Sequence, residues 1–426
     1  MGMTIAEKIL AKNSGHKEVV PGQIVEARVD VVMLHDVGTP GIQRPFNELG
    51  AKKIADNVEC IIIPDHFVPA PTVQAAENLK ITREFAKRMN VKNYYEIGHG
   101  GGICHQVMIE KGHVLPGQII IAPDTHATTY GCCGAFGTGF GVTDVAIGLA
   151  IGYIWLKVPQ TVKIVLNGKL KPGVSAKDVS LFLLKEFGES RLIYKAIEFY
   201  GPVIEEMSLD GRECMADMAL EMGVKTCFMI PDEKTMNYLR QRAGNVPDPV
   251  LPDEDACYEE TITYDLSGLT PFVAAPHAPS NGMPVKELEG IKIQQAFVGS
   301  CTNGRLEDLR ITAAVLKGKK VHRDVRLIIT PASQEIMKEA VREGIIEALI
   351  DSGAMITNPS CGACVGGHLG LIASGEACIS TSNRNFKGRM GSEEGQIYLA
   401  SPLVTALAAL NGEITVPTGK ELNEVD

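Results

Sequence analysis

The feature that most constrains the fold is a regular alternation of strand-like and helix-like segments in the last third of the chain. Short apolar runs indicate strands, and the longer runs between them carry the helical pattern. Parallel strands are joined by crossovers, usually helices, so this order predicts βαβ units in a parallel sheet covered by helices. The predicted order is strand 293–298, helix 306–316, strand 325–330, helix 333–350 and strand 354–357.

The rest of the chain divides into two further segments. A length of 426 residues predicts two or three domains. A second unit is expected to open with a strand at 161–167 and a helix at 176–187, and the Pro-rich, acidic stretch 246–260 indicates a connection. The chain is therefore expected to be of the α/β class. The predicted domains are 1–158, 159–280 and 281–426.

Composition and charge limit location and partners. Hydrophobic residues make up 45% and charged residues 22%, and the net charge of −10 argues against a nucleic-acid surface, which needs a basic face. The longest apolar run, Val145–Leu156, is predicted to be a buried helix, because it is too short to cross a bilayer. No signal peptide opens the chain, so the eleven cysteines are expected to be reduced thiols in the cytoplasm.

Two cysteine motifs stand directly after predicted strands. Cys301, in Gly-Ser-Cys-Thr-Asn-Gly, follows the strand that ends at Val298, and Cys361 and Cys364, in Cys-Gly-Ala-Cys, follow the third strand. The carboxyl ends of parallel strands are where α/β sheets bind ligands. Loop amides and helix N-termini at that edge are expected to lower the pKa of the thiols. Three thiolates could then converge on one soft metal centre.

The cysteine spacing alone leaves three kinds of site open. A lone Cys-x-x-Cys can be a redox pair, although that motif prefers a thioredoxin-like unit. A structural zinc ion usually takes four ligands and a second Cys-x-x-Cys. A cubane iron–sulfur cluster on three thiolates would leave one iron without a protein ligand, and such an iron can bind a hydroxyl and a carboxylate and remove the hydroxyl as water.

Histidine and aspartate cluster in the first segment, beside glycine-rich loops. Adjacent side chains on a strand point to opposite faces, so we expect pairing between loops rather than within each pair. Such pairing would orient the imidazoles and tune them for proton transfer, whereas any one of them alone could be a loop cap or a core histidine. The clusters are His35-Asp36, Asp65-His66, His105 and Asp124-Thr125-His126.

Two more groups of charged residues are candidates. Arg384 and Arg389 lie within an eight-residue stretch that also holds two asparagines, and they could bind carboxylates bidentately. The alternative is a solvated basic loop. Asp217 and Glu221 stand four residues apart on a predicted helix and so share one face, for which a solvated acidic surface is the alternative.

Taken together, these motifs resemble the aconitase superfamily and, within it, the large subunits of 3-isopropylmalate dehydratase and homoaconitase. The resemblance extends from Thr4 to about Gly412. It implies a three-domain α/β fold with parallel sheets flanked by helices, and a [4Fe–4S] cluster held by Cys301, Cys361 and Cys364. The spacing that carries it is Cys301, Cys361-x-x-Cys364 and then Asn383-Arg384-Asn385-Phe386-x-Gly388-Arg389.

The resemblance also implies roles for single residues. Two positions depart from the family pattern: Thr125 replaces the usual Ser, and Asp217 replaces the usual Asn, which would put an extra carboxyl near the site. Asp65 and His66 match the pair that helps to protonate the departing hydroxyl. The pairs implied around the open iron are His105 with Asp124 and His126 with Glu221. The residues implied to contact substrate or cluster are His35, Thr125, Asn383, Arg384 and Arg389.

The function implied is that of a hydro-lyase that dehydrates and rehydrates a small hydroxy-dicarboxylate or hydroxy-tricarboxylate. 3-Isopropylmalate is the first expectation, with homoaconitate and 2,3-dimethylmalate as alternatives. The chain is expected to lack the fourth, swivelling domain, which carries the catalytic base serine, and so to need a small subunit. Alternatives of another class are RNA binding by the cluster-free protein, which the net charge disfavours, and a structural zinc protein. No membrane or nucleic-acid partner is expected.

Overall fold

The computed structural model describes residues 2–419 and 421–422, and its first stretch forms a sheet in the order β4-β3-β2-β5-β6. All neighbours in this sheet are parallel. Its strands are β2 (Val31–Leu34), β3 (Glu59–Ile62), β4 (Asn93–Tyr94), β5 (Ile119–Ala122) and β6 (Phe136–Gly139). Its helices are α1 (Ile5–Ser14), α2 (Gly38–Glu48), α3 (Val73–Arg88), α4 (Cys104–Glu110), η1 (Thr125–Cys133) and α5 (Val142–Ile151). A separate antiparallel ribbon pairs β1 (Ile24–Arg28) with β7 (Tyr153–Lys157).

The middle stretch forms a second parallel sheet, in the order β10-β9-β8-β11. Its strands are β8 (Thr161–Asn167), β9 (Ala196–Tyr200), β10 (Thr226–Met229) and β11 (Glu260–Asp265). Its helices are α6 (Ala176–Phe187), α7 (Pro202–Glu206), α8 (Leu209–Ala219), η2 (Leu220–Met222) and α9 (Glu233–Ala243).

The last stretch forms a seven-stranded sheet in the order β13-β12-β18-β17-β14-β15-β16, parallel from β18 to β16 and antiparallel at β12. Its strands are β12 (Phe272–Ala274), β13 (Gly282–Pro284), β14 (Gln295–Val298), β15 (Arg326–Ile329), β16 (Met355–Ile356), β17 (Ala377–Ser380) and β18 (Gln396–Ala400). Its helices are η3 (Val285–Leu288), α10 (Leu306–Leu316), α11 (Gln334–Arg342), α12 (Ile345–Ser352), η4 (Gly362–Val365) and α13 (Pro402–Asn411).

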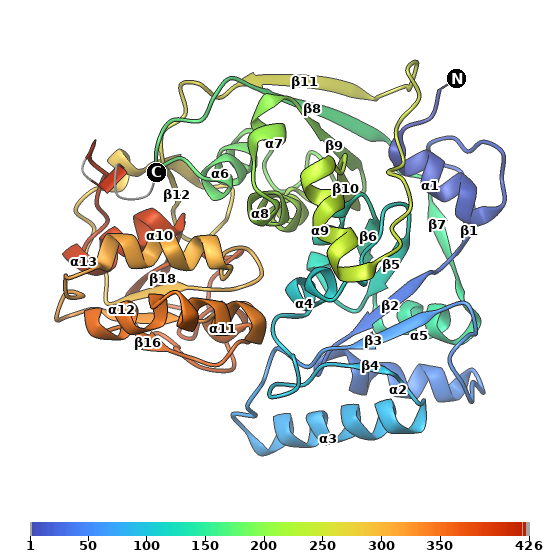
Figure 1. The fold of residues 1–426 in the computed structure, drawn as a ribbon, viewed down its shortest axis with the longest axis horizontal. Helices are drawn as coiled ribbons and strands as arrows, with labels where there is room; N and C mark the ends of the chain where they lie inside the picture. The colour runs from blue at the N-terminus through green and yellow to red at the C-terminus, as the bar shows by residue number, and fades with distance from the viewer. Residues whose placement is uncertain (1, 420, 423–426) are drawn as a thin grey trace.

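The α/β class, with parallel sheets flanked by helices, is confirmed. In Figure 1 the first stretch (blue to cyan) and the last (orange to red) lie on opposite sides, with the middle stretch (green) between them at the top. The helix at 176–187 and the helix at 306–316 occur with the predicted bounds. The proposed domain limits at 158 and 280 stay a prediction.

Two predicted helices were wrong in extent. The apolar run Val145–Leu156 is not one helix, because α5 ends at Ile151, where Gly152 adopts a left-handed conformation (φ 79°) and β7 follows. The predicted helix 333–350 is two helices, because Gly344 (φ 73°) separates α11 from α12. In both places a glycine inside an apolar pattern ends a helix, which periodicity alone did not reveal.

Capping explains how α6 is tied to the last sheet. Ser175 forms a capping box with Asp178, whose Oδ2 accepts the Ser175 backbone N–H at 2.8 Å. The other oxygen of Asp178 accepts the backbone N–H of Phe272, in β12, also at 2.8 Å. The start of α6 is therefore fixed against the last stretch of the chain, and this matters for Lys177 below.

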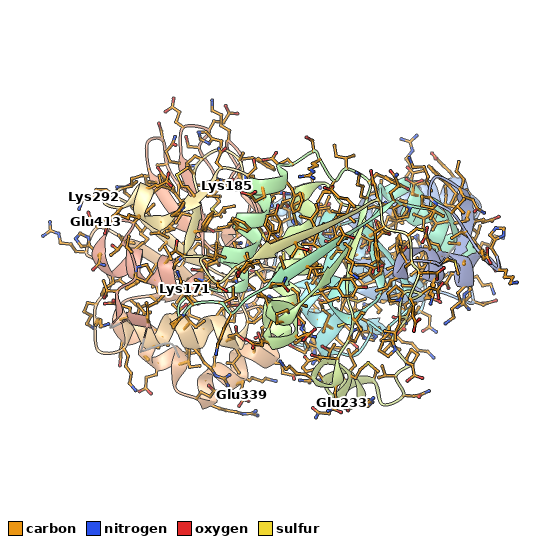
Figure 2. All side chains as sticks on the ribbon, turned by 90° about the horizontal axis from the view of Figure 1, so that it is seen from above. Lys171, Lys185, Glu233, Lys292, Glu339 and Glu413 are labelled. Atoms are coloured by element: carbon orange, nitrogen blue, oxygen red, sulfur yellow. The ribbon has the colours of Figure 1, made fainter. Side chains whose placement is uncertain are left out.

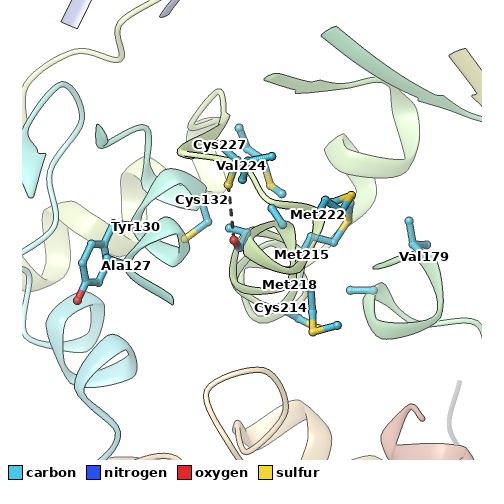
Figure 3. Packing of buried hydrophobic residues seen from close by; sticks show 14 of the residues in the cluster. Ala127, Tyr130, Cys132, Val179, Cys214, Met215, Met218, Met222, Val224 and Cys227 are labelled. Atoms are coloured by element: carbon cyan, nitrogen blue, oxygen red, sulfur yellow. Dashed lines mark hydrogen bonds between the residues drawn. The ribbon is translucent and has the colours of Figure 1, made fainter. Parts of the chain in front are cut away.

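Hydrophobic packing is continuous between the three sheets. One buried cluster contains Ile120 of β5, Ile164 of β8 and Phe297 of β14. Figure 3 shows part of it around α8, with Met215 and Met218 on that helix and Cys227 of β10 beside it. The thiol of Cys227 lies 3.6 Å from a backbone carbonyl of α8. The loops at the sheet edges therefore rest on a shared, rigid core.

Charged side chains lie mostly on the outside. Lys171, Lys185 and Glu233 project outward in Figure 2, as does the exposed ion pair of Lys292 with Glu413, whose atoms are 2.6 Å apart. Such exposed pairs contribute little to stability. Among the described helices, none has the length and apolar character needed to cross a membrane.

Candidate active site

Polar side chains of the first stretch gather at the carboxyl edge of its sheet. His35 and Asp36 follow β2, Asp65 and His66 follow β3, and the segment 124–126 follows β5. Because β2 pairs in parallel with both β3 and β5, these strand ends meet at one edge, where α/β proteins bind ligands. The sheet topology therefore brings together clusters that are far apart in the sequence.

Asp36 organises the loop after β3. Its carboxylate accepts the backbone N–H groups of Asp65 at 2.9 Å, His66 at 3.0 Å and Phe67 at 2.9 Å. Asp36 is 1% exposed, and hydrogen bonds to a buried carboxylate are among the stronger ones. The sequence indicated Asp36 only as a neighbour of His35, because nothing local reveals which distant amides a carboxylate will bind.

The pair Asp65-His66 corrects one prediction. We expected adjacent Asp and His to point apart, but Nδ1 of His66 lies 2.6 Å from Oδ1 of Asp65. The two residues lie beyond the end of β3, with His66 in a bend, so strand alternation no longer separates their side chains. Burial lowers the pKa of His66, but the nearby charges of Asp65, Asp36 and Asp124 outweigh it and raise that pKa to about 10.

His35 supports His66 from the other side. Their rings stack at a centroid distance of 4.4 Å. Nδ1 of His35 accepts the backbone N–H groups of Val37 and Gly38 at 3.2 Å, and Nε2 donates to the carbonyl of Pro123 at 3.2 Å. Burial, followed by the charge of His66, lowers the pKa of His35. Both ring nitrogens are thus engaged by backbone, which favours a supporting role over the substrate contact implied by the resemblance.

His105 and Asp124 form one of the expected pairs between loops. Nε2 of His105, in the first turn of α4, donates to Oδ1 of Asp124 at 3.0 Å, and Nδ1 lies 3.1 Å from the hydroxyl of Tyr130. Burial lowers the pKa of His105, but the Asp124 carboxylate reverses this and raises it. Burial likewise raises the pKa of Asp124, but His105, His35 and His66 hold it well below its usual range.

His126 and Glu221 form the second pair, and Arg384 joins it. Nε2 of His126 donates to Oε1 of Glu221 at 2.8 Å, and Nε of Arg384 lies 2.8 Å from the same oxygen. Nη2 of Arg384 donates to the hydroxyl of Thr125 at 3.3 Å. Asp217 and Glu221 are buried, so the solvated acidic face considered as an alternative is wrong.

The three candidate cysteines lie on loops at the carboxyl edge of the last sheet. Cys301 follows β14, and Cys361 and Cys364 follow β16 in and beside η4. The amide of Asn383 joins two of them, with Nδ2 3.2 Å from Sγ of Cys301 and Oδ1 3.3 Å from Sγ of Cys364. Nη2 of Arg389 lies 3.8 Å from Sγ of Cys364.

The cysteine loops face the His–Asp loops directly. The backbone N–H of Cys361 donates to the carbonyl of Asp65 at 2.9 Å, and Sγ of Cys361 lies 3.7 Å from Oδ2 of Asp65. The first and last stretches of the chain therefore meet between Asp65 and Cys361. The site combines soft sulfur ligands on one side with proton-carrying groups on the other.

The thiols of Cys301 and Cys361 are not activated. Burial raises the pKa of Cys301 and of Cys361 well above the ordinary value, and neighbouring Asp217 or Asp65 raises it further. The prediction that loop amides would lower these pKa values was wrong, because loss of hydration outweighs the local dipoles. A bound cation is what would hold such thiols as thiolates.

The donor set fits a polynuclear centre better than a single ion. In the residues described by the structure, groups of donors within 4.8 Å of one another occur among His35, Asp36, Asp65 and His66 and among Cys104, His105 and Asp124. No such group is formed by Cys301, Cys361 and Cys364. Their thiols are still close enough for neighbouring cysteines to help raise the pKa of Cys301 and Cys361. Three soft ligands with this wider spacing, two of them buried, suit an iron–sulfur cluster.

Two buried cations that support the cysteine loops were missed from the sequence. Arg305 donates to the carbonyls of Cys301 and Thr302, both at 2.6 Å, and Nε lies 2.7 Å from Oε2 of Glu213. Lys177, on α6, donates to backbone carbonyls of the segment before Asn383. Arg305 directly follows the Gly-Ser-Cys-Thr-Asn-Gly motif and folds back on its carbonyls, whereas the role of Lys177 depends on a contact with a distant segment.

Comparisons with known proteins match almost the whole chain. The model of the aconitase family (aconitate hydratase) matches residues 7–290 and 284–412. The chain is 48% identical to the 3-isopropylmalate dehydratase large subunit 1 of Methanopyrus kandleri and 49% identical to the 3-isopropylmalate dehydratase large subunit of Halothermothrix orenii. Each alignment spans 417 residues and covers 98% of this chain and 99% of the relative.

A solved structure supports the fold. The crystal structure of Thermococcus kodakaraensis aconitase X in its holo-form matches with a TM-score of 0.53, covering 99% of this chain and 94% of that one, at 14% identity. At that identity the match supports the fold alone. The family implies an iron–sulfur cluster, which agrees with the buried cysteines of the site. With a family model over most of its length and relatives near 48% identity, the chain belongs to the aconitase family.

Proposed function

We propose that this chain is the large subunit of a two-chain hydro-lyase that dehydrates and rehydrates 3-isopropylmalate and so serves leucine biosynthesis. The observation that carries the proposal is the meeting of two loop sets at Cys361 and Asp65. One set holds the three cysteines, and the other holds the paired His and Asp residues. The names and near-complete coverage of the relatives support 3-isopropylmalate over homoaconitate and 2,3-dimethylmalate.

Cys301, Cys361 and Cys364 would hold a [4Fe–4S] cluster. When bound, the cluster supplies a Lewis-acidic iron at the site. Asn383 contacts the sulfurs of Cys301 and Cys364 and would keep the two loops in register around it. Arg305 would fix the carbonyls beside Cys301, so that the loop keeps its shape.

His66 is the proposed proton donor to the departing hydroxyl. Asp65 holds Nδ1, so the proton on Nε2 is left to face the site. The Nε2 atom lies 3.6 Å from Oδ2 of Asp124. The carboxylates around the ring raise its pKa to about 10, so His66 carries its proton at neutral pH. A positioned acid of this kind typically contributes about 10²–10⁴-fold to the rate.

Arg389 and Arg384 are the proposed carboxylate-binding residues. Arg384 already donates hydrogen bonds to Glu221 and Thr125, so fewer of its N–H groups are available to a substrate. Nε of Arg389 is buried and has no hydrogen-bond acceptor among the described residues. A guanidinium with an unpaired donor is well suited to a substrate carboxylate. His105 with Asp124, and His126 with Glu221, would orient the reacting hydroxyl and exchange protons with it.

A small subunit is the proposed partner, because the relatives carry the name of a large subunit. It would bring a swivelling domain that closes over the site and supplies the base for the carbon-bound proton. Closure would also exclude water, which strengthens the electrostatic interactions within the site. We further propose that residues 1–158, 159–280 and 281–426 are the three domains of this chain.

The test is anaerobic reconstitution of this chain with iron, sulfide and the small subunit of the same assembly. Ultraviolet absorbance of the unsaturated product is followed for 3-isopropylmalate, homoaconitate and 2,3-dimethylmalate. We expect turnover with 3-isopropylmalate at the highest kcat/KM, and none without the small subunit. Preference for another acid would overturn the substrate assignment, and equal activity without the small subunit would overturn the two-chain proposal.

A further inference from the structure

Two buried residues of opposite charge lie behind the cysteine loops and take no part in the chemistry proposed above. Asp217 is on α8 and Lys177 is on α6, and both are 0% exposed. Nζ of Lys177 lies 3.5 Å from Sδ of Met218, which Figure 3 labels on α8. Both residues therefore reach the cysteine loops from the middle stretch of the chain.

Asp217 is one side chain away from two cysteines. One of its oxygens accepts a hydrogen bond from the amide of Asn383, whose own atoms lie 3.2 Å from Sγ of Cys301 and 3.3 Å from Sγ of Cys364. The other oxygen lies 3.1 Å from the hydroxyl oxygen of Thr129. The amide of Asn383 is a donor, which suits an ionised carboxylate.

Lys177 places an amino group between the two loops. Burial lowers its pKa, but its oxygen partners all accept hydrogen bonds, which suits an ammonium. Nζ donates to the carbonyls of Thr381 at 2.8 Å and Ser382 at 2.7 Å, and it lies 3.4 Å from Oγ1 of Thr302. Thr302 follows Cys301 directly, and Ser382 precedes Asn383. The ammonium is thus fixed beside one cysteine and beside the amide that touches two.

We propose that Asp217 and Lys177 are positioning residues that set the reduction potential of the cluster from opposite directions. The proposal rests on the proposed function, because it assumes the cluster. One-electron reduction adds a negative charge to the cluster. Inside a protein, where screening is weak, a fixed carboxylate opposes that charge and a fixed ammonium favours it.

Asp217 is the informative partner, since the amide of Asn383 links its carboxylate to two of the cysteines. Its carboxylate makes the potential more negative than a neutral side chain would, so cellular reductants are less able to add an electron. The cluster then stays in one charge state, which keeps its Lewis acidity constant. Lys177 limits the same effect by offsetting part of the buried negative charge.

The variant Asp217→Asn removes the charge with little change of shape. Its amide oxygen can accept from Asn383, and its NH2 can donate to Thr129, whose hydroxyl already donates to the carbonyl of His126 at 2.7 Å. Lys177→Gln removes the opposite charge and keeps an amide donor for the loop carbonyls. Glu198→Gln is the matched control, because Glu198 is a buried carboxylate bound to Tyr200, Tyr258 and the backbone of Ile5, on the middle sheet.

The experiment is a dithionite titration of each reconstituted two-chain holoenzyme, followed by electron paramagnetic resonance of the reduced cluster. Dithionite supplies the single electron. We expect a more positive potential for Asp217→Asn, a more negative one for Lys177→Gln, and the wild-type value for Glu198→Gln. Opposite shifts indicate charge, because structural loosening would not change sign with the residue removed.

The outcomes separate this inference from the proposed function. If the wild-type protein takes up no iron and sulfide on reconstitution, the proposed function is refuted. An intact cluster whose potential is unchanged or more negative in Asp217→Asn would overturn the inference alone. If Lys177→Gln does not retain the cluster, the direction in which Asp217→Asn shifts the reduction potential decides whether the inference holds. A shift of equal size in the Glu198→Gln control would also overturn it.

Discussion

The two halves of the site differ in how far the protein alone completes them. In the His–Asp half, carboxylates hold the imidazoles of His66 and His105 and the amides of the loop after β3 at 2.6–3.0 Å. In the cysteine half, the contacts of the sulfurs are 3.2–3.8 Å long, and burial raises the pKa of Cys301 and Cys361. The His–Asp half is therefore held in place without a ligand, whereas the cysteine half needs a bound cation to hold its thiols as thiolates.

The largest effect should come from the cysteine half. Replacing Cys364 by Ser is expected to abolish cluster binding and all activity, because a hydroxyl is a poor ligand for iron in a sulfide cluster. Iron, acid-labile sulfide and the visible spectrum are the measurements. Cys257→Ser is the control, since Cys257 is an exposed thiol remote from these loops. Full cluster retention in Cys364→Ser would refute the ligand assignment.

A change in the His–Asp half should separate chemistry from cluster binding. His66→Asn is expected to lower kcat by about 10²–10⁴-fold, the usual contribution of a positioned acid. Its iron and sulfide content should match the wild type, because no cysteine contact passes through the ring. Steady-state kinetics and metal analysis are run on the same preparation. Loss of the cluster in this variant would mean that the two halves are not independent.

Arg305 tests whether the shape of the cysteine loops is held by a buried ion pair. Arg305→Met leaves Glu213 buried without its partner, and breaking a buried pair in this way costs about 3–5 kcal/mol. Both residues are 1% exposed, so solvent cannot compensate. The free energy of unfolding of the cluster-free protein is the measurement, with Arg323→Met, whose side chain is 89% exposed, as the control. Equal stability in both variants would contradict the assigned role.

The smallest effect should be the response of the His–Asp half to loss of the cluster. The amides of Asp65, His66 and Phe67 donate to Asp36, so we expect little change in their hydrogen exchange when iron is removed. Amides of the Cys301 loop should exchange faster in the cluster-free protein. Similar acceleration in both loops would show that the cluster organises the whole site.

The sequence predicted well the features that depend on local pattern. The helices at 176–187 and 306–316 and the strand-end position of Cys301 follow from periodicity and from the order of elements. Prediction failed where the folded geometry of a loop or a distant contact decides. Lys177 binds carbonyls of a distant segment, and Arg305 folds back on the carbonyls of its own loop. The pairing of His66 with Asp65 depends on a bend that strand alternation does not describe.

The pKa of the cysteines shows a second limit. Position at strand ends suggested activated thiols, but the energy of burial depends on the finished packing and reversed that direction for Cys301 and Cys361. The domain limits at 158 and 280 likewise stay predictions. The hydrophobic cluster crosses all three sheets, so composition along the chain does not reveal where one folding unit ends.

Metal and sulfide analysis shows whether an iron–sulfur cluster completes the cysteine half. The chain is purified without oxygen, and iron, zinc and acid-labile sulfide are measured per polypeptide. We expect about four iron and about four sulfide, as a cubane cluster contains. About one zinc with no sulfide, as in a structural zinc site, would contradict this expectation.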